Sequence, residues 1–243
     1  MKPFVYVVIM LLTDYTGQAQ KKLWPPSIQS VELVMAAGKN DYTIAGSFEN
    51  NFQIGKQKRL LLGAGIRITV YGASNKDYFT APASLAKGAT GPGILFKERI
   101  NENLDTIQIG HPRMWMINLM AIMSFRVLPK LYTGFNIDVT GFSFGKMRTV
   151  RFIHDGNVTT TEASPARLNL LKIDDNAIGS QNSQFYLLYM VNGKVAIKAF
   201  YQLLYVEYKT TEKIQMEKGG FNNRFRNVPK GWGIGLSYHF KFK

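Results

Sequence analysis

Residues 231–243, GWGIGLSYHFKFK, decide the fold class of this chain. Large apolar side chains occupy every second position from Trp232 to Phe242, and Gly, Ser, His and Lys fill the positions between them. Successive side chains of a β-strand point to opposite faces, so the pattern predicts a strand with one apolar, aromatic face and one small or polar face. The C-terminal segment is therefore expected to separate an apolar environment from a polar one.

The same alternation recurs along the chain and predicts eight strands in all, at 28–37, 42–52, 58–73, 113–126, 130–144, 182–191, 194–208 and 230–242. The connections that follow the second, fourth and sixth strands are tight. Those at 74–112, 145–181 and 209–229 are long and rich in Gly, Asn, Ser and charge. Short periplasmic turns alternating with longer extracellular loops are typical of an outer-membrane barrel. We therefore predict an all-β fold, a closed antiparallel eight-stranded transmembrane β-barrel with both chain ends on the periplasmic side.

The two faces of the predicted strands differ in polarity. One face is a nearly continuous set of aliphatic and aromatic residues, whereas the other carries charges such as Arg67, Asp138 and Lys198. A soluble lipocalin-like barrel has the same strand count but an apolar interior and a wet exterior. The pattern favours the membrane barrel, whose lumen is polar.

The N-terminal segment, residues 1–19, is predicted to be a secretory signal peptide. Lys2 precedes the apolar run 3–12, and Gly17-Gln18-Ala19 offers small residues for cleavage before Gln20. The run is shorter than the ~20 residues that a transmembrane helix needs. The absence of cysteine excludes a disulfide framework and a lipid-modified N-terminal cysteine.

Residues 20–243 are then expected to form a single barrel domain with a strong positive charge. The formal net charge is +14. On an exported barrel this excess points to lipopolysaccharide phosphates or an acidic envelope protein as the partner, and not to nucleic acid. The spacing of acidic residues and histidines predicts no metal site, and no motif indicates a cofactor.

Seven charged residues have the parity of lumen positions or lie close to them: Glu32, Glu49, Arg59, Arg67, Arg126, Asp138 and Lys198. Opposite charges at similar depth are expected to pair, because a lone buried charge is costly. Such a network either lines a narrow pore or closes the lumen as a static plug. Eight strands leave an interior that side chains largely fill, which favours the plug.

The last long connection is basic and contains aromatic residues. We expect it to bind acidic sugars, lipid phosphates or a protein partner through Lys209, Lys213, Lys218, Phe221, Arg224, Phe225 and Arg226.

A catalytic arrangement is the weaker hypothesis. His154 and Asp155 offer a base and its orienting group, and Ser143 or Ser180 offers a nucleophile near the outer rim. Adjacent residues on a strand point in opposite directions, so solvation of a loop explains the dipeptide better. We assign no catalytic residue.

The signal peptide, the eight alternating strands and the aromatic C-terminal strand together resemble small outer-membrane β-barrel proteins of Gram-negative bacteria, especially those of the Bacteroidota. This resemblance implies an outer-membrane location and carries no catalytic residues across. Members of such families include structural anchors, accessory subunits, narrow channels and enzymes that modify lipid A. We expect a non-enzymatic structural or accessory barrel whose extracellular loops bind an envelope partner or lipopolysaccharide; the alternatives are a lipid A-modifying enzyme and a narrow pore.

Overall fold

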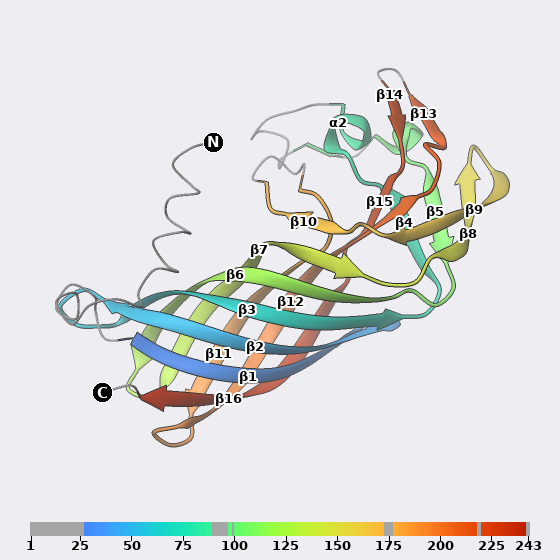
Figure 1. Ribbon diagram of the computed structural model, residues 1–243. Coiled ribbons are helices and arrows are strands. Elements are labelled where there is room, and N and C mark those ends of the chain that lie inside the picture. The colour runs from blue at the N-terminus through green and yellow to red at the C-terminus, as the bar shows by residue number, and fades with distance from the viewer. Residues whose placement is uncertain (1–26, 89–96, 99, 173–176, 218–219, 242–243) are drawn as a thin grey trace, which may run out of the picture.

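The computed structural model describes residues 27–88, 97–98, 100–172, 177–217 and 220–241, and the predicted signal peptide lies outside them. Eight long strands are β1 (Ser27–Gly38), β2 (Asp41–Ile54), β3 (Leu60–Ala73), β6 (Arg113–Leu128), β7 (Leu131–Phe144), β11 (Gln181–Met190), β12 (Val195–Thr210) and β16 (Lys230–Lys241). They pair antiparallel in the order β7-β6-β3-β2-β1-β16-β12-β11, and β11 pairs with β7 to close the barrel (Figure 1). The predicted fold class is confirmed, and every strand end lies within two residues of its prediction.

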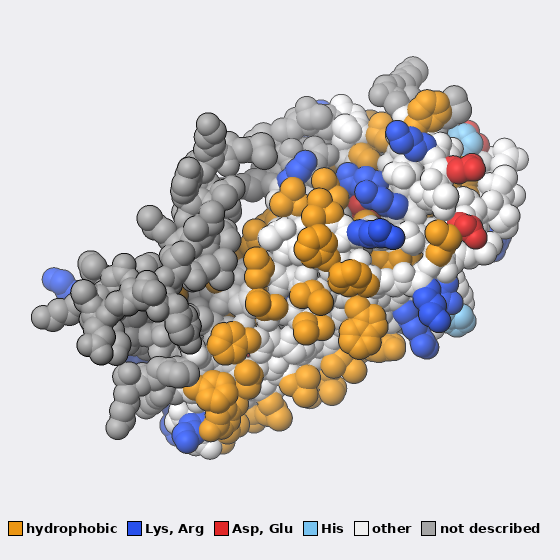
Figure 2. Space-filling view, viewed as in Figure 1, with side chains coloured by type: hydrophobic (Ala, Val, Ile, Leu, Met, Phe, Trp, Pro, Cys, Tyr) orange, Lys and Arg blue, Asp and Glu red, His pale blue; other side chains and the backbone are white. Residues whose placement is uncertain are grey.

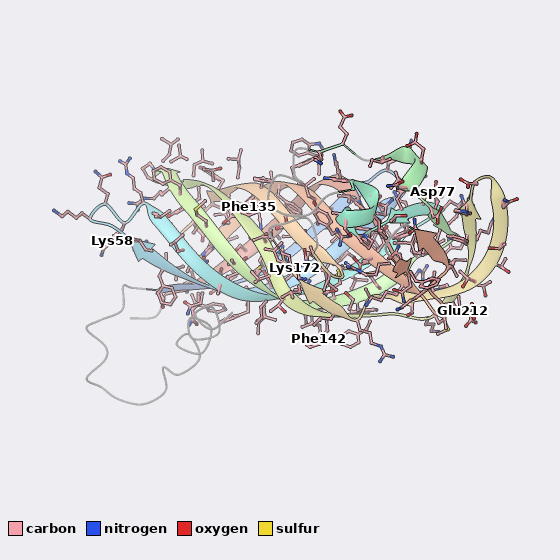
Figure 3. All side chains as sticks on the ribbon, turned by 90° about the horizontal axis from the view of Figure 1, so that it is seen from above. Lys58, Asp77, Phe135, Phe142, Lys172 and Glu212 are labelled. Atoms are coloured by element: carbon pink, nitrogen blue, oxygen red, sulfur yellow. The ribbon has the colours of Figure 1, made fainter. Side chains whose placement is uncertain are left out.

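The two ends of the barrel differ, as predicted. Tight turns at 55–59, 129–130 and 191–194 lie at the end where β1 begins and β16 finishes, which we call the turn end. The three long connections lie at the opposite, loop end. Figure 3 shows the separation, with Lys58 at the turn end and Asp77 and Glu212 at the loop end.

The exterior of the barrel is apolar and its lumen is polar. Ile66, Leu119 and Leu236 on the outer wall are 49%, 42% and 59% exposed. Arg67 and Lys198, which point inward, are 2% and 1% exposed. This polarity is that of a membrane barrel and is opposite to that of a lipocalin.

The small face of β16 from Gly231 to His239 points into the lumen, and bulky rings from neighbouring strands need its space. A Cβ added to Gly233 would overlap Cζ of Phe200 on β12. On the far wall, a Cβ on Gly134 would overlap Cζ of Tyr186. In the last strand, the large apolar residues therefore face lipid, and the glycines between them leave space for a ring from a neighbouring strand.

The long connections fold into a second closed ring of strands, which the sequence analysis did not predict. Its members are the outer part of β12 together with β4 (Lys76–Thr80), β5 (Thr106–Ile109), β8 (Arg148–His154), β9 (Asn157–Pro165) and β15 (Arg224–Asn227). They pair in the order β12-β15-β4-β5-β8-β9, and β9 returns to β12. We call this six-stranded ring the outer barrel. Asp155 and Gly156, with φ of 47° and 78°, make the tight turn of its β8–β9 hairpin.

Shorter elements surround the outer barrel. Strand β10 (Leu168–Leu170) pairs with β7, and β13 (Gln215–Glu217) pairs with β14 (Gly220–Asn222). Helix α2 (Ala83–Ala86) and the 3₁₀ turn Asn101–Asn103 lie in the first long connection. In the described part of the chain, no helix has the length and apolar character needed to cross a membrane.

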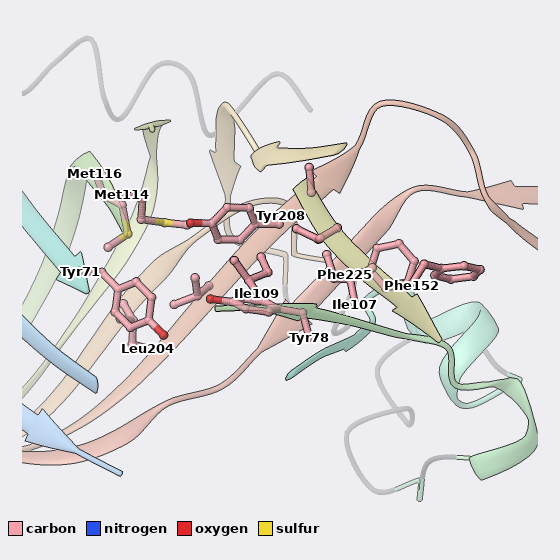
Figure 4. Close-up of a cluster of buried hydrophobic side chains, with 13 residues drawn as sticks. Tyr71, Tyr78, Ile107, Ile109, Met114, Met116, Phe152, Leu204, Tyr208 and Phe225 are labelled. Atoms are coloured by element: carbon pink, nitrogen blue, oxygen red, sulfur yellow. The ribbon is translucent and has the colours of Figure 1, made fainter. Parts of the chain in front are cut away.

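An apolar core fills the outer barrel and continues into the loop end of the large barrel (Figure 4). Ile107, Tyr78 and Phe225 come from the outer barrel, whereas Tyr71 and Met116 come from the upper lumen, and all five are fully buried. Burial raises the pKa of the Tyr78 phenol well above its ordinary value, so the ring stays neutral. One continuous core therefore joins the two barrels.

Candidate functional site

The first polar layer of the lumen is built around Lys198. Its Nζ donates to Glu32 Oε1 at 2.6 Å and to Gln184 Oε1 at 2.9 Å, and lies 4.4 Å from the centre of the Tyr186 ring. Strands β1 and β12, which carry the ion pair, flank β16. Lys198 lies opposite Gly235 in the ladder, so the inner face of β16 leaves room for the pair to form across it.

A second layer, nearer the loop end, centres on Arg67 and Asp138. Arg67 Nη2 and Nε lie 2.6 and 3.0 Å from Asp138 Oδ1, and Nη1 donates to Asn136 Oδ1 at 3.0 Å. The other carboxylate oxygen accepts from Asn118 Nδ2 at 2.7 Å and from the Asn182 amide at 2.9 Å. Both oxygens of this buried carboxylate are therefore satisfied, which offsets the cost of burying the charges.

Beyond the second layer large apolar side chains fill most of the lumen. Tyr71, Met114, Met116 and Leu204 are fully buried there and belong to the core shared with the outer barrel. From the turn end outward, the described side chains thus form two ionic layers followed by an apolar plug.

The structure brings together four of the seven predicted lumen residues and separates the other three. Glu49 is buried, but among the described residues its two oxygens meet only Asn51 Nδ2 and Ser47 Oγ, each at 3.4 Å. Arg59 is exposed in the turn just before β3. Arg126 is half-buried and donates to the Gln57 backbone oxygen at 3.2 Å.

Neither Arg59 nor Arg126 forms an ion pair with a described residue, so the prediction that they belong to the lumen network was wrong. Both lie at the turn end, where water solvates a guanidinium without an ion pair. Arg126 keeps the inward parity of Ile122 and Ser124 on β6, so its predicted face is correct although its ion pair is not formed.

The basic connection 209–229 also differs from the prediction, because part of it is interior. Phe225 is fully buried in the core of the outer barrel. Arg224 and Arg226 bond to the carboxylate of Glu207 at 2.8–2.9 Å, and that carboxylate is itself fully buried. These three residues therefore hold the outer barrel together and are unavailable to a partner. The remaining predicted residues are half-buried Lys209, exposed Lys213 and Phe221, and Lys218, which lies outside the described residues.

A basic band at the loop end of the apolar wall, which we call the outer rim, was not predicted from the sequence. Exposed Trp115, Phe144 and Trp232 near the ends of their strands are each followed, two residues further outward, by an exposed cation. These cations are Arg113, Lys146 and Lys230, and Arg167 beside exposed Leu168 extends the band. Figure 2 shows hydrophobic side chains spread over the barrel wall, with Lys and Arg gathered beside the outer barrel. An aromatic residue with a cation two positions outward was the signal in the sequence.

The histidine and serine residues do not assemble as a rim site. His154 Nδ1 lies 2.7 Å from Asp105 Oδ1, whereas its Nε2 lies 3.6 Å from Asp155. Asp105, and not the adjacent Asp155, therefore orients the ring. Ser143 and Ser180 are fully buried, so neither reaches a substrate at the rim. Among the described residues, no group of three or more His, Cys, Asp or Glu has the geometry of a metal site.

A closed antiparallel barrel with an apolar outer wall and a charged, polar lumen defines an outer-membrane β-barrel, and this chain is located in the outer membrane. No family model and no curated protein sequence matches the chain.

Three solved barrels illustrate the likeness in fold. Neisserial surface protein A (NspA) is 12% identical, with a TM-score of 0.37, and the match covers 89% of this chain and 96% of that one. The N-terminal β-barrel domain of Pseudomonas aeruginosa OprF is 10% identical, with a TM-score of 0.37 and coverage of 89% and 99%. A major outer membrane protein from Thermus thermophilus is 10% identical, with a TM-score of 0.38 and coverage of 88% and 99%. Likeness at this level assigns no activity.

Proposed function

We propose that this chain is a non-enzymatic outer-membrane barrel with a structural or accessory role, exported by its signal peptide in a Gram-negative bacterium. Its outer barrel serves as a rigid binding head, and its outer rim binds the phosphate groups of lipopolysaccharide. The observation that carries the proposal is the outer barrel itself, with a fully buried core that includes Ile107, Tyr78 and Phe225. A connection that only joins two strands does not need a core of its own.

The position of the outer rim supports lipid phosphate as the rim's ligand. Its cations lie just beyond the exposed aromatic residues of the wall, at the depth where lipid headgroups begin. Lys and Arg bind phosphate through charge-assisted hydrogen bonds. Arg113, Lys146 and Lys230 are on different strands or strand ends, so an array of phosphates at the membrane surface fits them better than one small anion does.

The test measures binding of lipopolysaccharide to the refolded protein. The triple variant Arg113→Glu, Lys146→Glu, Lys230→Glu should bind it at least about tenfold more weakly, since each lost cation contributes ~1 kcal/mol near an anionic surface. The matched control is Lys56→Glu, Lys58→Glu, Arg59→Glu, which makes the same charge change at the exposed turn end. Equal loss of binding in both variants would show that net charge alone attracts the lipid and would overturn the rim site.

The same preparations address the enzymatic alternative. Release of acyl chains from lipid A by the parent protein, abolished by His154→Asn, would replace the proposal with a lipid A-modifying enzyme. We expect no acyl release, because the buried Ser143 and Ser180 offer no accessible nucleophile.

A further inference from the structure

The lumen contains a cavity at the turn end. The roles described above for the ionic layers and the outer barrel do not account for it. Its volume is about 460 Å³, and we call it the vestibule. Turn residues Pro129, Lys130 and Asn192 line its mouth, while Glu49 and Tyr186 line its inner part. The volume is within the range of sites that hold small organic molecules. In an outer-membrane barrel the turn end faces the periplasm, so the vestibule opens there.

Two buried side chains of the vestibule, Glu49 and Asn51, carry hydrogen-bond acceptors that lack adequate donors. Glu49 and Asn51 line the cavity and are 8% and 7% exposed. Within the described residues, the Oδ1 atom of Asn51 has no hydrogen-bond partner, and Glu49 accepts only the two 3.4 Å bonds given above. A buried acceptor without a donor costs free energy, so the arrangement suits a ligand that supplies donors.

The charges of the large barrel's lumen do not balance. Among the described residues, its buried carboxylates are Glu32, Glu49 and Asp138, and its buried cations are Arg67 and Lys198. Lys198 pairs with Glu32 and Arg67 pairs with Asp138, which leaves Glu49 without a cation of its own in this set. Lys130 and His239 also line the vestibule, but in the described part of the chain neither forms an ion pair with Glu49. An ionised Glu49 carboxylate would be balanced by one positive charge from a ligand.

Much of the remaining wall of the vestibule is apolar. Leu61, Leu188 and Met190 line it together with the rings of Tyr132 and Tyr186. Such a wall accommodates a hydrocarbon chain or ring, and aromatic faces also attract cations. The cavity thus combines a buried carboxylate and an unpartnered amide oxygen with a largely apolar wall.

We propose that the vestibule is a binding site for a small organic ammonium compound that enters from the periplasmic side. The ammonium group donates to Glu49 and Asn51, and the apolar part of the molecule packs against Leu61, Leu188 and Met190. This site is separate from the outer rim and does not depend on lipopolysaccharide binding.

The probe is n-hexylammonium, which carries three N–H donors on an apolar chain, and its binding is measured by calorimetry on the refolded protein in detergent micelles. We expect saturable binding that weakens at least about tenfold in Glu49→Gln, which keeps the shape of the side chain and removes its charge. Glu162→Gln removes an exposed carboxylate from the outer barrel and should leave binding unchanged. Hexanol and hexanoate, of the same length, should bind more weakly than the ammonium compound in the parent protein.

A second variant keeps the site testable if Glu49→Gln fails to fold. Leu188→Trp fills the cavity without changing any charge and should also abolish binding, while heat-modifiable migration in a gel confirms that the barrel has formed. Hexylammonium binding of equal strength in the parent, in Glu49→Gln and in Leu188→Trp would show that the amine only enters the micelle and would overturn the site. Equal binding of hexanoate and hexylammonium would overturn the charge selectivity.

Discussion

At the scale of single residues, Lys198 shows how a charge is kept inside a barrel. The ammonium group meets one carboxylate, one amide oxygen and one aromatic face, and it is 1% exposed. Desolvation of such a group is costly unless each of its donors finds a partner. Glu32 and Gln184 therefore supply the hydrogen-bond acceptors that make the buried Lys198 stable.

Lys198→Ala should lower the free energy of unfolding by about 3–5 kcal/mol, because it leaves Glu32 buried without its cation. Urea unfolding in detergent, followed by heat-modifiable migration, measures the change. Lys194→Ala, an exposed residue in the nearby turn, is the control and should change the stability by less than about 0.5 kcal/mol. The double variant Lys198→Met, Glu32→Gln should recover part of the loss. Equal stabilities of Lys198→Ala and the control would contradict the ion pair.

Gly233 gives a second prediction at this scale. Alanine there places a Cβ on top of Phe200 Cζ and 2.6 Å from the Met35 backbone oxygen, so the wall or the ring must move. We expect a loss of about 1–3 kcal/mol in unfolding free energy. Gly193→Ala is the matched control, since no described atom lies within 4 Å of its added Cβ. If the two alanine variants unfold at the same urea concentration, the close packing of Phe200 on Gly233 is not as described.

At the scale of strands, alternation was sufficient to locate all eight strands of the large barrel, because each is long and each separates lipid from a polar lumen. Alternation was insufficient where the ladder is irregular. Leu119 pairs with Thr140 and Met120 with Asp138, so Val139 is an extra residue in β7. The bulge reverses the parity beyond it, and Phe142 and Phe144 are exposed where strict alternation from Ile137 would bury them. No local feature of the sequence marks that position.

The outer barrel was not predicted from the sequence, and the physical reason is different. Strands β4 and β5 have five and four residues, too few for alternation to distinguish them from a loop. Their stability comes from distant partners, for example Phe225 on β15 opposite Thr80 on β4. Phe225, Arg224 and Arg226 were predicted to lie on the surface. They are internal because of the same long-range pairing.

The lipid-facing side of a strand can be tested at Ile66, in the middle of β3 and 49% exposed. Ile66→Lys should destabilise the folded barrel by about 2–4 kcal/mol in lipid, because the ammonium lies near the bilayer midplane. Equilibrium folding into vesicles measures this cost. Thr159→Lys, also at an exposed position but on the outer barrel, is the control and should fold like the parent protein. Unchanged folding of the Ile66 variant would mean that this face does not meet lipid.

At the scale of the whole molecule, the two barrels share strand β12 and a continuous core. Val195 to Leu203 of β12 pair with β16 in the large barrel, and Val206 to Lys209 pair with β15 in the outer barrel. The lumen therefore leads from the vestibule through two ionic layers to an apolar plug, and then meets the core of the outer barrel. Such an arrangement suits a binding head on a closed anchor better than it suits a channel.

This closure predicts that the parent protein produces no steady single-channel conductance in planar bilayers at moderate voltage. Fully buried Met116 and Tyr71 close the upper lumen, and the buried pairs of Lys198 and Arg67 close the middle, so side chains fill the path that ions would have to take. Heat-modifiable migration of the same sample must first show that the barrel has folded. The double variant Arg67→Ala, Lys198→Ala should still not conduct, because the apolar plug remains, even though it is less stable. Uniform conductance steps from the folded parent would show an open lumen, and the narrow pore would then replace the closed anchor as the function.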